Sequence, residues 1–190
     1  MAVLVQQKAP TFDHPLTVAQ MPRAGTLRTA AAAAQETTRV LAVMIAFQED
    51  NDNRTTGNGS FDLSSTPSKI FDPPPRDRAY FQNHLQFAEN YFRSVSDGRR
   101  IIAATLLDSV FRLPHVMQYY SPPRGSSVNT EVGLLLQDSW HLVDSLTPGF
   151  PFEQYDAFLI FHAGAGRDID FVSILGYDPL PYDIPSLYVN

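Results

Sequence analysis

The sequence predicts an α/β (α+β) fold in which two main helices back a twisted mixed sheet. Residues 40–47 and 157–163 are apolar runs that are too short for helices of normal length, which is typical of buried central strands. Residues 77–95 and 130–146 instead repeat apolar residues every three or four positions, as amphipathic helices do. With 190 residues, 44% of them hydrophobic, the chain can form one domain with a sizeable core.

The amino-terminal residues show no sustained periodicity and mix polar residues with prolines. We expect residues 1–38 to form a flexible leader or linker and residues 39–190 to form the domain. The alanine run at residues 30–34 favours a short helix, because alanine has the best helix propensity, but this helix would have no apolar stripe to dock. The apolar start at residues 1–5 is too short for a signal peptide, so none is predicted in this chain.

Charge and composition disfavour several classes of protein. The formal net charge is −6 and the Lys and Arg residues do not cluster, so neither nucleic acid nor an anionic membrane is expected as a partner. No apolar run approaches the roughly 20 residues that span a bilayer, so no membrane span is predicted. The chain has no cysteine, which excludes disulfides and thiolate sites.

The loop after the first central strand is rich in acidic residues and invites a calcium interpretation. Counted from Asp50, an EF-hand loop needs glycine at its sixth position and glutamate at its twelfth, and these positions hold Thr55 and Phe61. A solvated turn is therefore the preferred prediction. Calcium binding at Asp50 and Asp52 stays open.

The first helix is expected to begin after Asp77, a good N-cap that follows the prolines at residues 73–75, and to end near Val95. Its apolar residues predict one broad face against the sheet: Phe81, Leu85, Ala88 and Phe92, widened by Tyr80, Phe87 and Tyr91. The turn at Asp97 and Gly98 leads into residues 100–113, which predict a second long strand or a hairpin pair.

The second helix is predicted from a cap at Asn129 or Thr130 to near Leu146. Its inner face comprises Val132, Leu135, Leu136, Ser139, Leu142 and Val143. Asp138, His141 and Asp144 permit a metal interpretation, but steps of three residues drift round a helix, so a solvated face is favoured. Residues 172–190 are proline-rich and extended, and their apolar end is expected for a chain cut within a domain.

The most suggestive site follows the second central strand. A buried strand that ends in a glycine turn delivers a loop to the surface, and this loop contains Gly164, Gly166, Arg167 and Asp168. The loop matches neither a dinucleotide fingerprint nor a phosphate loop. His162, at the strand end, is the candidate catalytic residue, although a buried histidine bonded to backbone is the commoner outcome at such a position.

Known hydrolase motifs are missing from the sequence. It contains no Gly-x-Ser-x-Gly elbow and no His-Glu-x-x-His helix, so no metal ligand is assigned in this chain. An α/β-hydrolase-like site at residues 164–170 is a third interpretation, ranked behind the two given below.

Four segments occur in an order that matches a known family. After the strand at residues 40–47, residues 91–98 read YFRSVSDG, and residues 113–120 combine Leu-Pro-His with a Tyr-Tyr pair. Residues 152–156 then read FEQYD, and residues 159–164 read LIFHAG. Over residues 39–170, these segments resemble the "YYxEVSYG", "LP…YY" and "DFSxYD…vvHAG" stretches of the immune inhibitor A family of secreted bacterial zinc metallopeptidases.

The resemblance implies a zincin-like N-terminal subdomain of a secreted or cell-surface protein that hydrolyses peptide bonds with a zinc-bound water. The family's zinc motif would follow residue 190, so zinc is implied for the complete protein and this chain alone should be inactive. The implied partners are a peptide or protein substrate and the missing C-terminal half of the domain. The implied substrate-aligning edge strand, which a peptide joins by β-augmentation, consists of Ile184, Pro185, Ser186, Leu187, Tyr188 and Val189.

The chain departs from the family pattern at two places. Asp97 stands where the family has tyrosine, and Asp156 runs directly into the strand, without the usual Asp-rich insert and the calcium ligands that it carries. The second departure is consistent with an alternative, a non-catalytic secreted or surface binding protein (a pseudopeptidase) on the same fold.

Overall fold

The computed structural model describes residues 2–7, 35–65, 72–123, 130–168 and 170–189. The strands are β1 (Ala2–Gln7), β2 (Glu36–Ala46), β3 (Arg100–Arg112), β4 (Ala157–His162) and β5 (Leu187–Val189). The helices are α1 (Arg78–Val95), α2 (Thr130–Leu146) and α3 (Phe171–Leu175), with 3₁₀ turns η1 (Met117–Tyr120) and η2 (Phe152–Gln154). No helix among these residues is long and apolar enough to cross a membrane.

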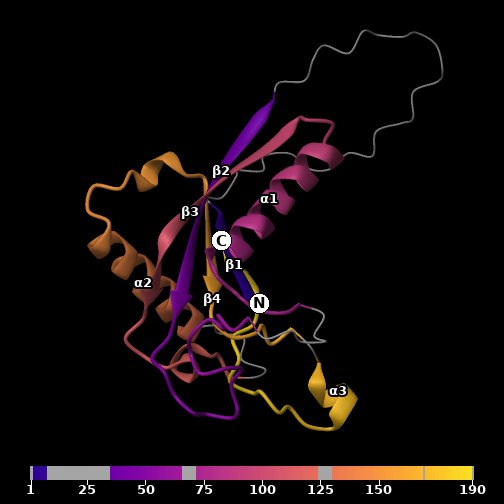
Figure 1. Cartoon of the computed structure of the whole chain (residues 1–190), viewed down its shortest axis with the longest axis vertical. Coiled ribbons are helices and arrows are strands. Elements are labelled where there is room, and N and C mark those ends of the chain that lie inside the picture. The colour runs from indigo at the N-terminus through magenta and orange to yellow at the C-terminus, as the bar shows by residue number, and fades with distance from the viewer. Residues whose placement is uncertain (1, 8–34, 66–71, 124–129, 169, 190) are drawn as a thin grey trace, which may run out of the picture.

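The five strands form one mixed sheet in the order β3-β2-β4-β1-β5 (Figure 1). β2 lies between β3 and β4 and is parallel to both, whereas β1 is antiparallel to β4 and parallel to β5. Parallel neighbours need a crossover, and α1 and α2 lie in the connections that lead to β3 and β4. The predicted α/β fold, with a mixed sheet and two main helices, is confirmed at this level.

The amino-terminal segment differs from the prediction at both of its ends. β1 lies within the expected leader and pairs with β4, from Ala2 opposite His162 to Gln7 opposite Ala157. β2 also begins earlier than expected, at Glu36. The sequence does not reveal β1, because its short apolar start shows no period that distinguishes a strand from a leader. The alanine run at residues 30–34 lies outside the described residues.

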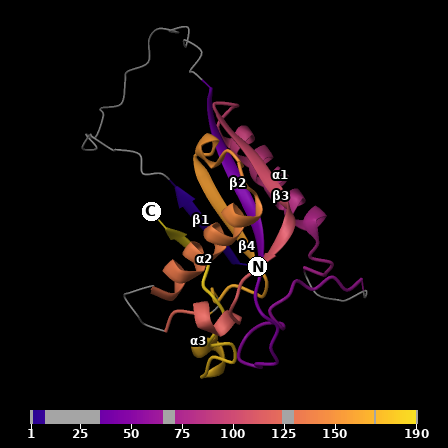
Figure 2. The ribbon, with the colours of Figure 1, turned by 90° about the vertical axis from the view of Figure 1, so that its left-hand side faces the viewer.

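Each face of the sheet is covered by one helix, with α2 in front and α1 behind in Figure 2. On the first face, Val43, Ile45 and Ile160 pack with buried residues of α2. On the second face, Met44 and Phe161 pack with buried residues of α1. Because successive residues of a strand point to opposite faces, β2 contributes to both layers of the core.

α1 begins where the sequence predicts. The carboxylate of Asp77, its N-cap, accepts a hydrogen bond from the backbone N–H of Tyr80 at 2.9 Å. Phe81 and Leu85, in the first half of the helix, are buried as expected. α2 likewise buries Val132, Leu135, Ser139 and Val143 of its predicted inner face.

The broad apolar face predicted for α1 is wrong in the second half of the helix. Three of its residues are largely exposed: Phe87 by 71%, Tyr91 by 52% and Phe92 by 44%. The reason lies in the register of the sheet, because β4 begins to pair with β2 only at Val40. Glu89 bonds to Ala104, the partner of Val40 on β3, so beyond Glu89, at Tyr91 and Phe92, the helix runs beside two strands only. Phe87 follows the buried Leu85 by two positions and therefore lies on a different side of the helix.

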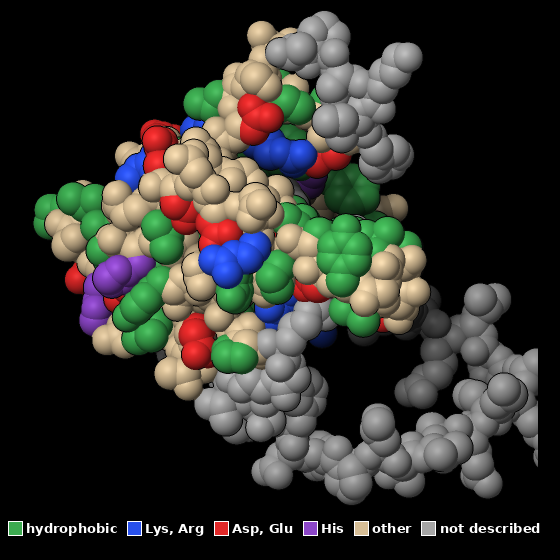
Figure 3. Space-filling model, turned by 90° about the horizontal axis from the view of Figure 1, so that it is seen from below, with side chains coloured by type: hydrophobic (Ala, Val, Ile, Leu, Met, Phe, Trp, Pro, Cys, Tyr) green, Lys and Arg blue, Asp and Glu red, His purple; other side chains and the backbone are tan. Residues whose placement is uncertain are grey.

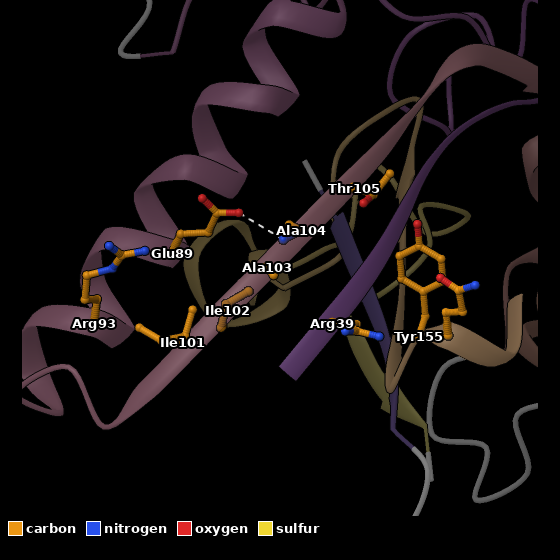
Figure 4. Close-up of a pocket in the computed structure, with 10 residues that line it drawn as sticks. Arg39, Glu89, Arg93, Ile101, Ile102, Ala103, Ala104, Thr105 and Tyr155 are labelled. Carbon is orange, nitrogen blue, oxygen red and sulfur yellow. Dashed lines mark hydrogen bonds between the residues drawn. The ribbon is translucent and has the colours of Figure 1, made fainter. Parts of the chain in front are cut away.

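Residues 100–112 form a single strand, β3, and side chains of α1 bond to two backbone groups of its free edge, which we call the sealed edge. In the hollow of about 490 Å³ beside β3, an oxygen of Glu89 accepts a hydrogen bond from the backbone N–H of Ala104 at 2.9 Å (Figure 4). Arg78 donates to the carbonyl of Leu106 at 3.2 Å and pairs with Asp108 at 2.8 Å. An unpaired strand edge is a template for another chain, so these contacts protect the edge of β3.

We expect Glu89→Leu to make the chain self-associate, because the N–H of Ala104 then lacks a partner at an open strand edge. The free energy of unfolding should fall by about 1–2 kcal/mol, since a hydrogen bond to a charged group is lost. Sedimentation velocity over a range of concentrations and urea unfolding measure the two effects.

Glu89→Gln is the matched control, because it keeps an acceptor oxygen at the same place and removes only the charge. This variant should remain monodisperse and close to the parent chain in stability. If Glu89→Gln self-associated as strongly as Glu89→Leu, the charge rather than the sealed edge would be responsible.

Candidate functional site

The carboxyl ends of β2, β3 and β4 meet at one end of the sheet, which is the usual location of binding sites in parallel α/β sheets. Backbone hydrogen bonds join the loops there, from Gln48 N to His115 O at 3.0 Å and from Tyr182 N to Arg54 O at 3.2 Å. Figure 3 views this end, where hydrophobic side chains are interspersed with separate acidic and basic ones.

The candidate catalytic residue, His162, is buried at the end of β4, with 1% of its surface exposed. Its Nδ1 lies 2.7 Å from the carbonyl oxygen of Ala163, so Nδ1 carries the proton and donates it to that carbonyl. The ring packs edge-on against Phe47, with centroids 5.8 Å apart. Burial lowers the pKa of His162 to about 4, so the imidazole is neutral at neutral pH. Nε2 is buried and has no hydrogen-bond partner within the described part of the chain.

Both glycines of the candidate loop contact neighbouring segments, and Gly164 is placed where only glycine fits. Gly164 has φ +90°, and a Cβ at this position would collide with Met117 and with the carbonyl oxygen of Thr56. Gly166 forms a parallel bridge with Ile184. Both positions therefore bring the loop against neighbouring segments.

The two charged residues of the loop hold the carboxyl-terminal segment in place. Arg167 donates to the carbonyl oxygens of Pro181 at 2.7 Å and Pro122 at 3.0 Å. The carboxylate of Asp168 accepts from the backbone N–H of Ser186 at 2.9 Å and from its hydroxyl at 2.7 Å. The loop predicted as a site thus acts as a clamp on residues 181–186.

Asp183, which the sequence does not single out, joins the loops more tightly than any predicted site residue. It is 2% exposed, and its carboxylate accepts from the N–H and the hydroxyl of Thr56, both at 2.6 Å. The hydroxyl of Ser121 donates to its carbonyl oxygen at 3.2 Å. Burial raises the pKa of Asp183, and the hydrogen bonds from Thr56 oppose the rise. No local motif marks this contact, because its partners lie 127 residues apart.

Residues 184–189 form an edge segment that pairs with two neighbours in turn. The first part is bonded to the clamp through Ile184 and Ser186. The second part is β5, which pairs with β1 from Leu187 opposite Leu4 onward. β5 is the last strand in the sheet order, so no strand of the described residues pairs with its outer side.

The regular strand at this edge is shorter than the predicted residues 184–189. It covers Leu187–Val189 only. Pro185 has no N–H to give to a ladder, and the N–H of Ser186 is bonded to the Asp168 side chain instead. The tyrosine of this strand, Tyr188, is 53% exposed.

Three of the four acids that invited metal interpretations, Asp50, Asp52 and Asp138, have other partners. Asp52 pairs with Arg54 at 2.8 Å and donates its N–H to Asp50 at 3.1 Å. Asp138 accepts a hydrogen bond from the hydroxyl of Tyr120 at 2.8 Å. In the part of the chain that the structure describes, no group of three His, Cys, Asp or Glu side chains is placed to hold a metal ion.

The chain matches no protein-family model, no curated protein and no solved structure. At the carboxyl end of the sheet, Arg167, Asp168 and Asp183 hold loops together. At the end of the sheet order, no strand of the described residues pairs with the outer side of β5. Function is therefore inferred from this geometry and from the resemblance of the sequence segments.

We expect His162 to make the free energy of unfolding decrease as the pH is lowered from neutral. In the unfolded chain this residue binds a proton below its ordinary pKa of 6.5, whereas in the folded chain it stays neutral down to a pH of about 4. The unfolded state gains its proton first, so His162 lowers the stability by about 3 kcal/mol across this window. Urea unfolding at about pH 7 and about pH 4.5, followed by tryptophan fluorescence, measures the change.

His162→Leu provides the comparison, because leucine fills the same apolar site and cannot titrate. The stability of this variant relative to the parent chain should rise as the pH falls through the window. A difference between the two proteins that does not depend on pH would contradict a neutral, buried His162.

Proposed function

We propose that this chain is the N-terminal part of a metallopeptidase-like domain and that it aligns an extended peptide along residues 184–189. The resemblance to the immune inhibitor A family gives the class of protein, and implies that it is secreted or held at the cell surface. The proposal that this segment aligns a peptide substrate rests on the position of β5 as the last strand of the sheet. An extended peptide can add to such an edge through its backbone hydrogen bonds.

The edge segment is held in position before a peptide arrives, which supports this role. Asp168 fixes Ser186 through two hydrogen bonds, and Ile184 anchors the start of the segment with no exposed surface. Arg167 ties the preceding turn to Pro122. A strand that is already ordered loses little conformational freedom on binding, which favours affinity.

The two edges of the sheet differ in a way that supports the same role. At the β3 edge, Glu89 and Arg78 occupy backbone groups that another strand would need. Proteins seal edges in this way to prevent association. The proposal assigns association to the edge at β5.

Hydrolysis belongs, in this proposal, to the complete protein. A zinc-bound water would need a set of ligands that the described residues do not provide. His162 is buried and bonded to the carbonyl of Ala163. In this proposal, the role of this chain is therefore to align a peptide, and none of its residues is assigned to the hydrolysis step.

A non-catalytic secreted or surface binding protein is the second candidate, and Asp156 favours it. The carboxylate of Asp156 accepts from the N–H of Arg39 at 2.8 Å, and its N–H donates to the carbonyl of Arg39 at 2.9 Å. This aspartate ties β4 to β2 where the resembling family has an Asp-rich insert. Both candidates use the same peptide edge, and hydrolysis of casein by the complete protein distinguishes them.

An NMR titration of the isotope-labelled chain with oxidised insulin B chain, an unstructured peptide, tests the proposal. The amide signals of Ser186, Leu187, Tyr188 and Val189 should shift saturably below about 1 mM peptide, equivalent to about 4 kcal/mol. The amide of Ala104, at the sealed edge, should not shift.

Asp168→Ala should weaken the binding by about threefold to tenfold, because it releases Ser186 and the edge loses its order. Glu153→Ala, a substitution of an exposed acid on η2, should leave the affinity unchanged. Saturable shifts confined to residues outside 184–189, or no saturable shift up to about 1 mM peptide, would overturn the peptide edge.

A further inference from the structure

A hollow of about 360 Å³ lies between α2, η2 and the start of β4, away from the loops described above. It is lined by Trp140, His141, Asp144, Phe152 and Phe158. Trp140 and Phe158 meet edge to face, with ring centroids 5.2 Å apart and ring planes at 73°. The lining is therefore mainly aromatic, and it includes no lysine or arginine.

The aromatic rings offer carbon surface to this hollow. Trp140, Phe152 and Phe158 are each partly exposed. The indole Nε1 of Trp140 is itself buried and has no hydrogen-bond partner in the described part of the chain, so the exposed part of the ring is carbon. The face of an aromatic ring carries negative potential and attracts a cation within about 6 Å of its centroid.

Two further negative contributions meet at the same place. The exposed carboxylate of Asp144 lines the hollow. α2 ends shortly afterwards, at Leu146, and the carbonyl groups at a helix C-terminus form the negative end of its dipole. The last turn of α2 contains no basic residue that would balance this charge.

We propose that the hollow binds a small organic cation, a quaternary or methylated ammonium group, with Asp144 as its counter-ion. Such a group has an apolar outer surface that suits the walls formed by Trp140, Phe152 and Phe158, and its positive charge suits the ring faces. The site shares no residue with the edge segment 184–189 and does not depend on the proposed peptide binding.

The negative charge at the hollow favours a cation over neutral or anionic ligands of the same size. A neutral apolar ligand would fill the hollow but would leave Asp144 and the helix end uncompensated. An anion would be repelled by both. A bare metal ion requires several oxygen or nitrogen ligands, and of the residues that line the hollow only His141 and Asp144 carry such ligands.

Fluorescence titration with choline chloride tests the proposal directly, because Trp140 is the only tryptophan of the chain. Choline should change the emission saturably, with half-saturation at about 0.1–10 mM. The uncharged isostere 3,3-dimethyl-1-butanol should bind at least about fivefold more weakly, since it lacks the cation. Sodium chloride at equal ionic strength should have no effect.

Substitutions locate the binding without removing the fluorophore. Asp144→Asn should weaken choline binding by about threefold, because the partner charge is lost at an exposed site. Phe152→Leu should also weaken it, since it keeps an apolar side chain but removes a ring. Glu153→Gln is the matched control, because it removes an exposed acid next to Phe152 that does not line the hollow.

Far-UV circular dichroism of each variant verifies that the fold is kept, and a shift of the Trp140 indole N–H signal in NMR provides a second readout. Equal affinity for choline and its uncharged isostere would overturn the proposal in favour of a simple apolar pocket. No saturable response to choline up to about 100 mM would overturn it entirely.

Discussion

Burial of β2 on both of its faces is the constraint on which the rest of the structure depends. Residues 41–47 are each exposed by 1% or less. A strand in such surroundings needs hydrogen-bonded neighbours at both edges and a cover on both faces, because its backbone groups and apolar side chains cannot meet water. β3 and β4 provide the neighbours, and α1 and α2 provide the covers. The parallel pairing then brings the carboxyl-end loops together.

Features that depend on a local apolar pattern could be predicted from the sequence. The two buried runs became β2 and β4, and the amphipathic segments became α1 and α2, with Asp77 as the first N-cap. Features that depend on pairing between segments far apart in the sequence could not be predicted. β1 is a strand because β4 lies beside it, and Tyr91 and Phe92 are exposed because β4 does not extend beneath them.

The same distinction applies to the candidate site. The position of His162 at a strand end follows from the apolar run, but its neutral state depends on burial beside Phe47. The contact of Asp183 with Thr56 joins segments 127 residues apart, and the hollow beside Trp140 depends on how α2, η2 and β4 pack together. The contacts that Arg167 and Asp168 make with the carboxyl-terminal segment could not be predicted either, because the sequence of a loop does not determine which distant residues its side chains contact.

The difference between the two edges of the sheet links this fold to its proposed function, and amide hydrogen exchange measures it most directly. The amide of Ala104, bonded to Glu89, should exchange slowly, like the amides of β2. Within β5, amides bonded to β1 should also be protected, whereas an amide on the outer side should exchange faster than these. Protection of every amide of Leu187–Val189 in the free chain, or rapid exchange at Ala104, would contradict an open edge at β5 and a sealed one at β3.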